Sequence, residues 1–197
     1  MSKTPDQIVH LIERLGRLTR STQHAEGLKP AQWEALRFLS RANKMSRTPG
    51  ALADFLSSTR GTVSQTLIIL EKKGLIIRSA NPGDGRGKNL DLTDAGCATI
   101  ARDPLALIGT AVARLATVIG NSAEEDSLKT GLKSVLHEVT RQSGVPTFGD
   151  CDGCAHFGEN GAVDDDPGPH RCLLRGISVS KTERHLICRD HQVNSAA

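Results

Sequence analysis

The sequence predicts a mainly α-helical fold with one small β-hairpin, a helical dimerisation region and a small loop-rich tail. Apolar residues recur at helical spacing through most of the chain up to about residue 143. Glycines and a proline lie between two short apolar runs near residues 75–92, a pattern typical of a hairpin. After Gly144 the periodicity stops and glycine, proline and acidic residues dominate. We therefore expect two units, residues 1–145 and residues 146–197.

Composition sets the size and the compartment of the protein. A chain of 197 residues with 38% apolar content can bury one substantial core and one small module. The net charge is +3, with the basic excess before residue 146 and an acidic tail after it, which favours attraction to phosphate but is also ordinary for soluble domains. No stretch has 18 consecutive apolar residues, and the N-terminus lacks a cleavable apolar segment, so we expect a cytoplasmic protein without membrane contact.

A helix from about Arg60 to Lys73 is the element around which the first unit is organised. One stripe of it is apolar, with residues at i, i+4 and i+7, namely Val63, Leu67 and Leu70. Ser58 or Thr59 supplies an oxygen for the first free amides, and Gly74 is a C-terminal stop signal. Both ends of this helix are therefore encoded locally.

A second, shorter helix precedes it closely. Residues 49–56 predict a helix with Leu52, Ala53 and Leu56 turned inward, and Ser57 and Ser58 leave room only for a turn, which is helix-turn-helix spacing. A helix that enters the major groove reads bases through its N-terminal residues. We therefore expect DNA contacts from Arg60, Gly61, Thr62, Ser64 and Gln65. Gln65 suits adenine, and Arg60 suits guanine or phosphate.

The predicted hairpin resembles a wing beside that helix. Residues 75–78 and 90–92 are short apolar runs that flank NPGDGRGKN, so we expect two short strands with a flexible, glycine-rich tip. The tip carries Arg86 and Lys88, which would contact DNA, because an arginine can enter a narrow minor groove where the potential is most negative. Asp84 is placed to orient Arg86. The alternative is a solvated surface turn with no role in binding.

Residues from about Gln7 to Arg141 resemble the MarR family of winged helix-turn-helix transcriptional regulators. The resemblance rests on LKPAQWEALRFL, on ALADFLSSTRGTVSQTLIILEKKGLI, and on a D-x-R pattern at Asp84 and Arg86 followed by LDLTDAG. It implies an obligate homodimer, binding to a palindromic operator in double-stranded DNA, and release by a ligand or a redox signal. It does not cover the tail after Val145, and the sequence identifies no small-molecule effector.

The remaining helices predict a dimer interface. We expect helices from Pro5 to His24, from Pro30 with Trp33 in the core, from Asp94 to an interruption before Pro104, and from a capping box at Ser122 and Glu125. The helices after Pro104 carry apolar residues at 3,4 spacing, and such a narrow seam fits a partner helix. The alternative is a seam within one chain. We expect Cys97, on the helix from Asp94, to be a small buried residue.

The tail contains four cysteines that predict one metal centre per chain: Cys151, Cys154, Cys172 and Cys188. A cytoplasmic protein keeps its thiols reduced, which argues against disulfides. Two thiolates in C-x2-C and two from later segments can close a tetrahedral zinc site, and zinc is favoured. Because Cys172 and Cys188 stand alone instead of in a second C-x2-C, an iron-sulfur cluster is the alternative, followed by a reactive-thiol switch or no centre at all.

Two other functional classes compete with a DNA-binding regulator, which the resemblance suggests is a repressor. A metal-dependent enzyme would need a general base and an open metal position, and neither H-E-x-x-H nor a Ser/His/Asp arrangement is visible. We therefore expect no enzymatic activity. A non-DNA-binding interaction protein would not need Arg60, Gln65 and Arg86.

Overall fold

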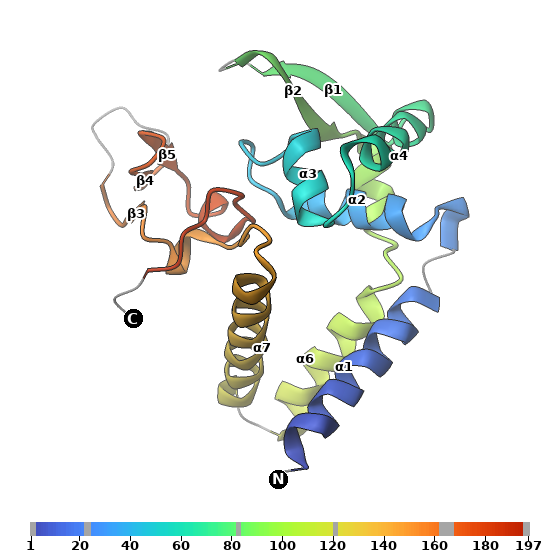
Figure 1. Cartoon of the computed structure of the whole chain (residues 1–197), viewed down its shortest axis with the longest axis vertical. Coiled ribbons are helices and arrows are strands. Elements are labelled where there is room, and N and C mark those ends of the chain that lie inside the picture. Colours follow the sequence, from blue (N-terminus) through green and yellow to red (C-terminus); the bar gives the residue numbers. More distant parts are fainter. Residues whose placement is uncertain (1–2, 22–24, 82–83, 120–121, 162–167, 195–197) are drawn as a thin grey trace.

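The structure is a computed structural model that describes residues 3–21, 25–81, 84–119, 122–161 and 168–194. It is mainly helical, with two small antiparallel sheets, β1-β2 and β3-β4-β5. Helix-turn-helix and wing lie at one end of the molecule, helices α1, α6 and α7 extend from them, and the tail lies on the side of α3 and α7 (Figure 1). The helices are α1 (Thr4–Ser21), α2 (Pro30–Arg41), α3 (Pro49–Phe55), α4 (Arg60–Lys72), α5 (Asp94–Ile100), α6 (Ala106–Ile119) and α7 (Ser122–Ser143). The predicted winged-helix fold is confirmed.

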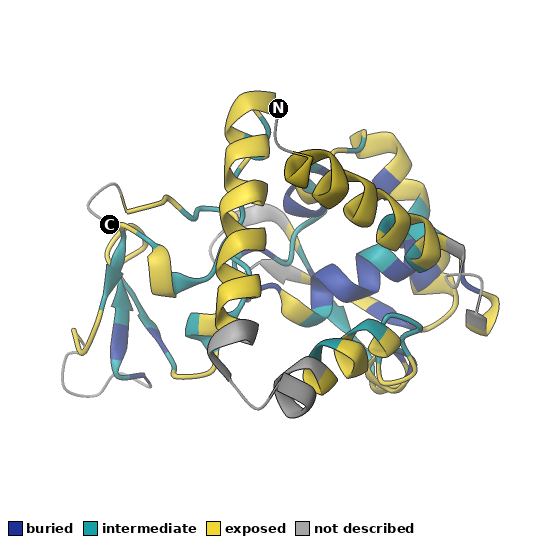
Figure 2. Ribbon diagram, turned by 90° about the horizontal axis from the view of Figure 1, so that it is seen from below, coloured by how far each residue is buried: buried dark blue, intermediate teal, exposed yellow. Residues whose placement is uncertain are grey.

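The core surrounds α2. Trp33 is fully buried, as predicted, and the guanidinium of Arg37 lies 5.6 Å from the centre of its ring. Leu67 and Leu70 of α4 pack into the same cluster, to which Leu52 of α3 also belongs. Burying each such side chain stabilises the fold by about 1.5–3 kcal/mol. Buried residues concentrate in this region, whereas α1, α6 and α7 are mostly exposed (Figure 2). We call residues 30–92, which comprise α2, α3, α4, the connections between them and the wing, the reading head.

Both helices of the helix-turn-helix begin and end as their sequences predict. The Thr48 side chain accepts a hydrogen bond from the Ala51 amide at the start of α3, and Thr59 accepts one from the Thr62 amide at 3.2 Å at the start of α4. Gly74, with φ of +69°, follows the end of α4 in a left-handed conformation that glycine adopts at little cost. Helix α4 is therefore fixed in length at both ends.

The wing differs from the prediction in the extent of its strands. β1 (Ile76–Asn81) and β2 (Asp84–Leu92) pair from Ile76–Leu92 out to Asn81–Asp84, with an irregularity after Ala80. Arg86 and Lys88 thus belong to a strand and not to a flexible tip, and that part of the prediction was wrong. Backbone hydrogen bonds of an antiparallel pair do not require side chains, so glycines weaken a ladder without ending it.

Two other local predictions need correction. Cys97 is exposed, because the buried positions of α5 are Gly96 and Thr99; a Cβ at Gly96 would collide with the carbonyl of Leu75. In the tail, no sequence pattern indicates a three-stranded sheet, yet β3 (Phe157–Gly158), β4 (His170–Cys172) and β5 (Ile177–Val179) form one. The tail also has short 3-10 turns at Cys151–Gly153 (η2) and Glu183–His185 (η3). Each strand is too short to produce an alternating pattern.

Several predictions fall partly on residues that are not described. The first helix ends at Ser21, and residues 22–24 lie outside the described ranges. Helix α7 begins at Ser122, but the side chains of the predicted capping box at Ser122 and Glu125 also lie outside them. Among the described residues, no helix is both long enough and apolar enough to cross a membrane.

A nearly buried ion pair joins α2 to the connection between α5 and α6. Helix α5 ends at Ile100 and α6 begins at Ala106, so the interruption before Pro104 is confirmed. Asp103 accepts two hydrogen bonds from Arg37, at 2.7 and 2.6 Å, and the two side chains are 12% and 7% exposed. Burial raises the pKa of Asp103, but the bonds from Arg37 and from the Leu105 amide outweigh it and hold the pKa below its ordinary value.

We expect Asp103→Ala to destabilise the fold by about 3–5 kcal/mol, because Arg37 would remain buried without its partner. Chemical denaturation at pH 7 measures this loss. Because the pKa of Asp103 is lowered in the folded state, the contribution is present above its ordinary value and is lost as the pH falls below it. Glu138→Ala, which breaks an exposed pair with Arg141, is the control and should leave the midpoint nearly unchanged. Equal effects of the two substitutions would contradict the prediction.

Candidate DNA-binding surface and cysteine cavity

Helix α4 turns its predicted base-reading residues to solvent. Val63, Leu67 and Leu70 are buried, and the side of the helix facing away from them carries the polar residues. The five predicted residues are all exposed: Arg60, Gly61, Thr62, Ser64 and Gln65. Because the buried stripe fixes the rotation of α4 about its axis, these side chains form one surface at its N-terminal half.

The wing is attached firmly to the helix-turn-helix. The Arg78 guanidinium at its base pairs with Glu71 of α4 at 3.1 Å, and Arg47, which precedes α3, pairs with Asp91 at 3.3 Å. The Leu90 amide donates to the Arg47 carbonyl at 2.7 Å. These contacts set the direction of β2 relative to α4. Lys88 is exposed, and the Arg86 side chain lies outside the described set, as does any contact between it and Asp84.

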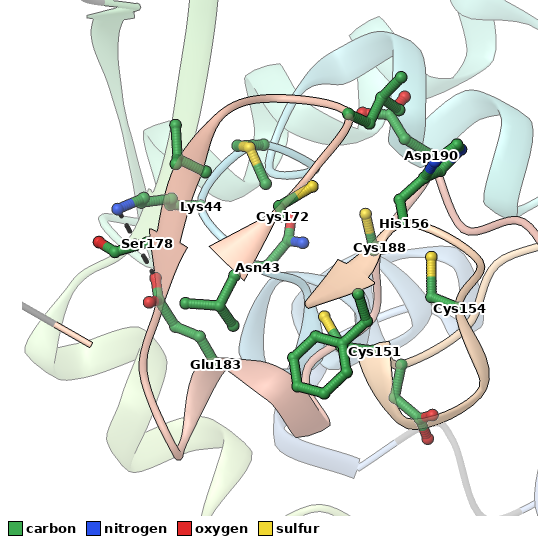
Figure 3. A pocket seen from close by; sticks show the side chains of 16 residues that line it. Asn43, Lys44, Cys151, Cys154, His156, Cys172, Ser178, Glu183, Cys188 and Asp190 are labelled. Atoms are coloured by element: carbon green, nitrogen blue, oxygen red, sulfur yellow. Dashed lines mark ion pairs between the residues drawn. The ribbon is translucent and has the colours of Figure 1, made fainter. Parts of the chain in front are cut away.

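The four tail cysteines line one cavity of about 30 Å³, although they lie on separate segments (Figure 3). Cys151 and Cys154 come from η2 and the residue after it, where the Cys154 amide donates to the Cys151 carbonyl at 3.1 Å. Cys172 ends β4, and its strand pairing places it opposite Phe157. Cys188 is bridged to Gly149. All are free thiols.

The four predicted metal ligands line the same cavity, but their side chains are not close enough together to coordinate one metal ion. Among the described His, Cys, Asp and Glu side chains, no group of three or more is placed to hold a metal ion. A metal would therefore have to draw the sulfurs together. His156 and Asp190 also line the cavity. His170 packs against Phe157 with ring centres 5.1 Å apart, and His185 pairs with Asp152 at 3.1 Å, so these two histidines have structural contacts.

One wall of the cavity was not predicted from the sequence. Asn43, Lys44 and Met45, from the connection between α2 and α3, line it together with the cysteines. Nothing in their sequence marks them, because their role depends on contact with a segment more than a hundred residues away. The reading head and the cysteines therefore share one cavity.

Two of the thiols, Cys151 and Cys188, have raised pKa values and favour their protonated form. Burial raises the pKa of Cys151 to about 12, and repulsion from the neighbouring Cys188, Cys154 and Cys172 adds to the shift. Burial also raises the pKa of Cys188, although hydrogen bonds from Asn43, from the Asp190 backbone and from Ser46 oppose that rise. Any metal bound through these sulfurs would release protons.

Arginine–carboxylate pairs hold the segments around the cavity. Arg184 of η3 donates to Asp152 of η2 at 2.7 Å and to Glu159 at 3.3 Å. Arg175 donates to Asp190 at 2.9 Å, and the pKa of its guanidinium is raised, first by that bond. These pairs take the place of an apolar core in the tail, where Val179 is the only buried hydrophobic residue among those described.

In the reduced, metal-free protein we expect iodoacetamide to modify Cys97 about tenfold or more faster than Cys151 at pH 7.5. Cys97 is exposed, whereas Cys151 is partly buried and its raised pKa leaves little thiolate. Peptide mass spectrometry over time measures both rates. Cys97→Ser should remove the fast phase, and unfolding in urea should equalise the rates. Equal rates in the folded protein would contradict the raised pKa.

Comparison with known proteins supports the fold of the first unit. The sequence model of the MarR family matches residues 26–87, which include the helix-turn-helix. A crystal structure of a MepR mutant from S. aureus is similar at a TM-score of 0.55 and 22% identity, covering 71% of this chain and 99% of that one. A second MepR mutant gives a TM-score of 0.50 and 22% identity, covering 68% and 97%. These similarities show a shared fold. No curated protein matches the sequence.

Proposed function

We propose that this chain is a DNA-binding transcriptional regulator of the MarR type, a repressor that acts as a homodimer on a palindromic operator. The observation that carries the proposal is the exposed polar surface of α4, held in place by the buried stripe on its other side. Arg60 and Gln65 lie at the end of the helix that would enter the major groove. The wing is fixed beside it through Arg78 and Glu71, so Lys88 would reach the flanking backbone. The family match over residues 26–87 supports this reading.

The homodimer is supported by the apolar faces of the outer helices. In the single chain, Leu11 of α1 is 58% exposed and Leu132 of α7 is 51% exposed. They belong to longer rows of exposed apolar residues, which comprise Ile8, Leu15 and Leu18 on α1 and Leu128, Val135 and Val139 on α7. Rows of this kind on a folded chain mark an association surface. A two-fold dimer would present two copies of α4 to two half-sites.

We further propose that the tail holds one metal centre per chain through Cys151, Cys154, Cys172 and Cys188, with zinc favoured. All four line one cavity, and its volume of about 30 Å³ suits an ion, since pockets for organic ligands measure about 300–1,000 Å³. Four thiolates are a preferred ligand set for structural zinc. An iron-sulfur cluster, which is also held by four thiolates and spans a wider site, is the alternative.

DNA binding is tested with a site selected by the purified full-length protein from a random double-stranded library. We expect an inverted repeat with half-sites about 10 base pairs apart, centre to centre. Gln65→Ala should weaken binding about 5- to 150-fold and relax the preference at one base pair, as the loss of a bidentate base contact does. Lys88→Ala should weaken binding to all sequences alike and lower the salt dependence by about one for each phosphate that it no longer neutralises.

Fluorescence anisotropy at several salt concentrations separates the two effects. Lys181→Ala is the control, because it removes an exposed lysine of the tail that belongs to neither α4 nor the wing. The proposed DNA-binding surface would be overturned if the protein selected no site from the library. It would also be overturned if Gln65→Ala left the DNA affinity and the base preference unchanged.

The metal centre is tested by anaerobic purification followed by elemental analysis and a visible spectrum. We expect about one zinc per chain and no colour, and we expect Cys172→Ser to lose the metal because it removes one of four ligands. Cys97→Ser is the matched control and should keep it, since Cys97 lies outside the cavity. Iron with acid-labile sulfide would select the alternative cluster. The proposal would be contradicted if the wild-type protein contained neither zinc nor an iron-sulfur cluster, or if Cys172→Ser kept a full complement of metal.

A further inference from the structure

The connection between α2 and α3 contains polar side chains that are buried. Asn43 is 5% exposed and Ser46 is 1% exposed. The Asn43 side-chain oxygen accepts a hydrogen bond from the Ser46 amide at 2.9 Å. Buried polar groups need such partners, because each unsatisfied group costs about 1–3 kcal/mol. The conformation of this connection sets where α3 begins, and α3 is the first helix of the helix-turn-helix.

The tail supplies further hydrogen-bond partners of this connection. The Ile187 amide donates to the Arg41 carbonyl at 2.7 Å, and the Asn43 amide donates to the Ile187 carbonyl at 2.9 Å. The Arg189 amide donates to the buried Ser46 hydroxyl at 2.9 Å. Residues 187–189 therefore run beside the connection like an added strand. We call residues 187–189 the docking segment.

Side chains of the tail also hold α3 itself. The Arg189 guanidinium pairs with the Asp54 carboxylate of α3 at 2.5 Å. Phe148 meets Phe55 of α3 edge-on with ring centres 5.1 Å apart, and it meets Phe38 of α2 at 6.1 Å. The tail thus touches both helices that position α4, although it makes none of the predicted DNA contacts.

Cys188 connects this contact to the cysteine cavity. It is the middle residue of the docking segment, between the two residues that bind the reading head, and it lines the cavity with the other three cysteines. The connection lines the same cavity through Asn43, Lys44 and Met45, and the Asn43 side chain hydrogen-bonds to Cys188 (Figure 3). A ligand that draws the four sulfurs together must fix Cys188, and with it Ile187 and Arg189.

From this juxtaposition we infer that the cysteine centre regulates DNA binding within its own chain, with the docking segment as the mechanical link. When a metal binds the four cysteines, it fixes the docking segment. The fixed segment holds the connection between α2 and α3, and α3 itself, in the arrangement that presents α4 to DNA. Loss of the metal frees the docking segment and lowers the affinity of the protein for DNA. Coupling between two such sites typically changes affinity about 5- to 150-fold, and DNA must raise the affinity for the metal by the same factor. The inference rests on the proposed metal centre and on the proposed DNA binding.

The test compares the DNA affinity of zinc-loaded full-length protein with that of protein stripped by a chelator under reducing, anaerobic conditions. We expect the loaded form to bind the selected site about 5- to 150-fold more tightly. Arg189→Gln should reduce this ratio towards one while zinc content stays at one per chain, because Arg189 joins the segment to α3 and is no zinc ligand. Lys181→Gln removes the same charge from an exposed tail position and should keep the wild-type ratio.

Hydrogen exchange gives a second readout that does not use DNA. Stripping zinc should remove protection from amides of residues 43–56 in the wild type, and Arg189→Gln should lack that protection even when loaded. If Arg189→Gln does not fold, Asp54→Asn breaks the same pair from the other side. Equal DNA affinity of loaded and stripped wild type overturns the inference but leaves the proposed function intact. A chain that takes up no metal overturns the inference and the proposed metal centre. A chain that binds no DNA overturns the inference and the proposed DNA binding. Metal analysis and anisotropy distinguish the two cases.

Discussion

The packing of α4 against α2 is the interaction on which the other features depend. Val63, Leu67 and Leu70 are almost completely buried, so α4 can neither rotate nor slide without exposing several apolar side chains. Each would cost about 1.5–3 kcal/mol. The exposed residues of α4 owe their common direction to this stripe, and the wing is then attached to α4 by Arg78. The polar residues of α4 form one defined surface because the opposite side of the helix is apolar and buried.

Local signals in the sequence predicted the reading head well, and long-range contacts account for what they missed. Thr59, the apolar stripe and Gly74 fix α4 within sixteen consecutive residues, so its limits needed no tertiary information. The extent of the wing strands depends on pairing across the hairpin, and the exposure of Cys97 depends on where α5 meets Leu75. The cysteines were recognisable as a set, but Asn43 beside them was not, because no periodicity relates it to the tail.

The tail and the reading head are stabilised by different means. The head has a continuous apolar cluster centred on Trp33. The tail relies on Arg184 and Arg175 bound to carboxylates and on the ring contact between Phe157 and His170. Exposed ion pairs contribute about 0–1 kcal/mol each, so under the proposed metal binding the tail would gain most of its stability from the metal at its cysteines and from the surface on which it rests.

The hydrogen bond from Arg189 to Ser46 joins residues 143 positions apart, and this separation has a consequence during synthesis. At about 5–20 residues per second, roughly 7–30 s pass between translation of the two residues. The reading head can fold in far less time, since small helical domains fold within milliseconds. Every newly made molecule thus passes through a period in which its helix-turn-helix exists without the tail. If the tail controls DNA binding as we infer, the nascent chain and the finished protein would differ in their affinity for DNA.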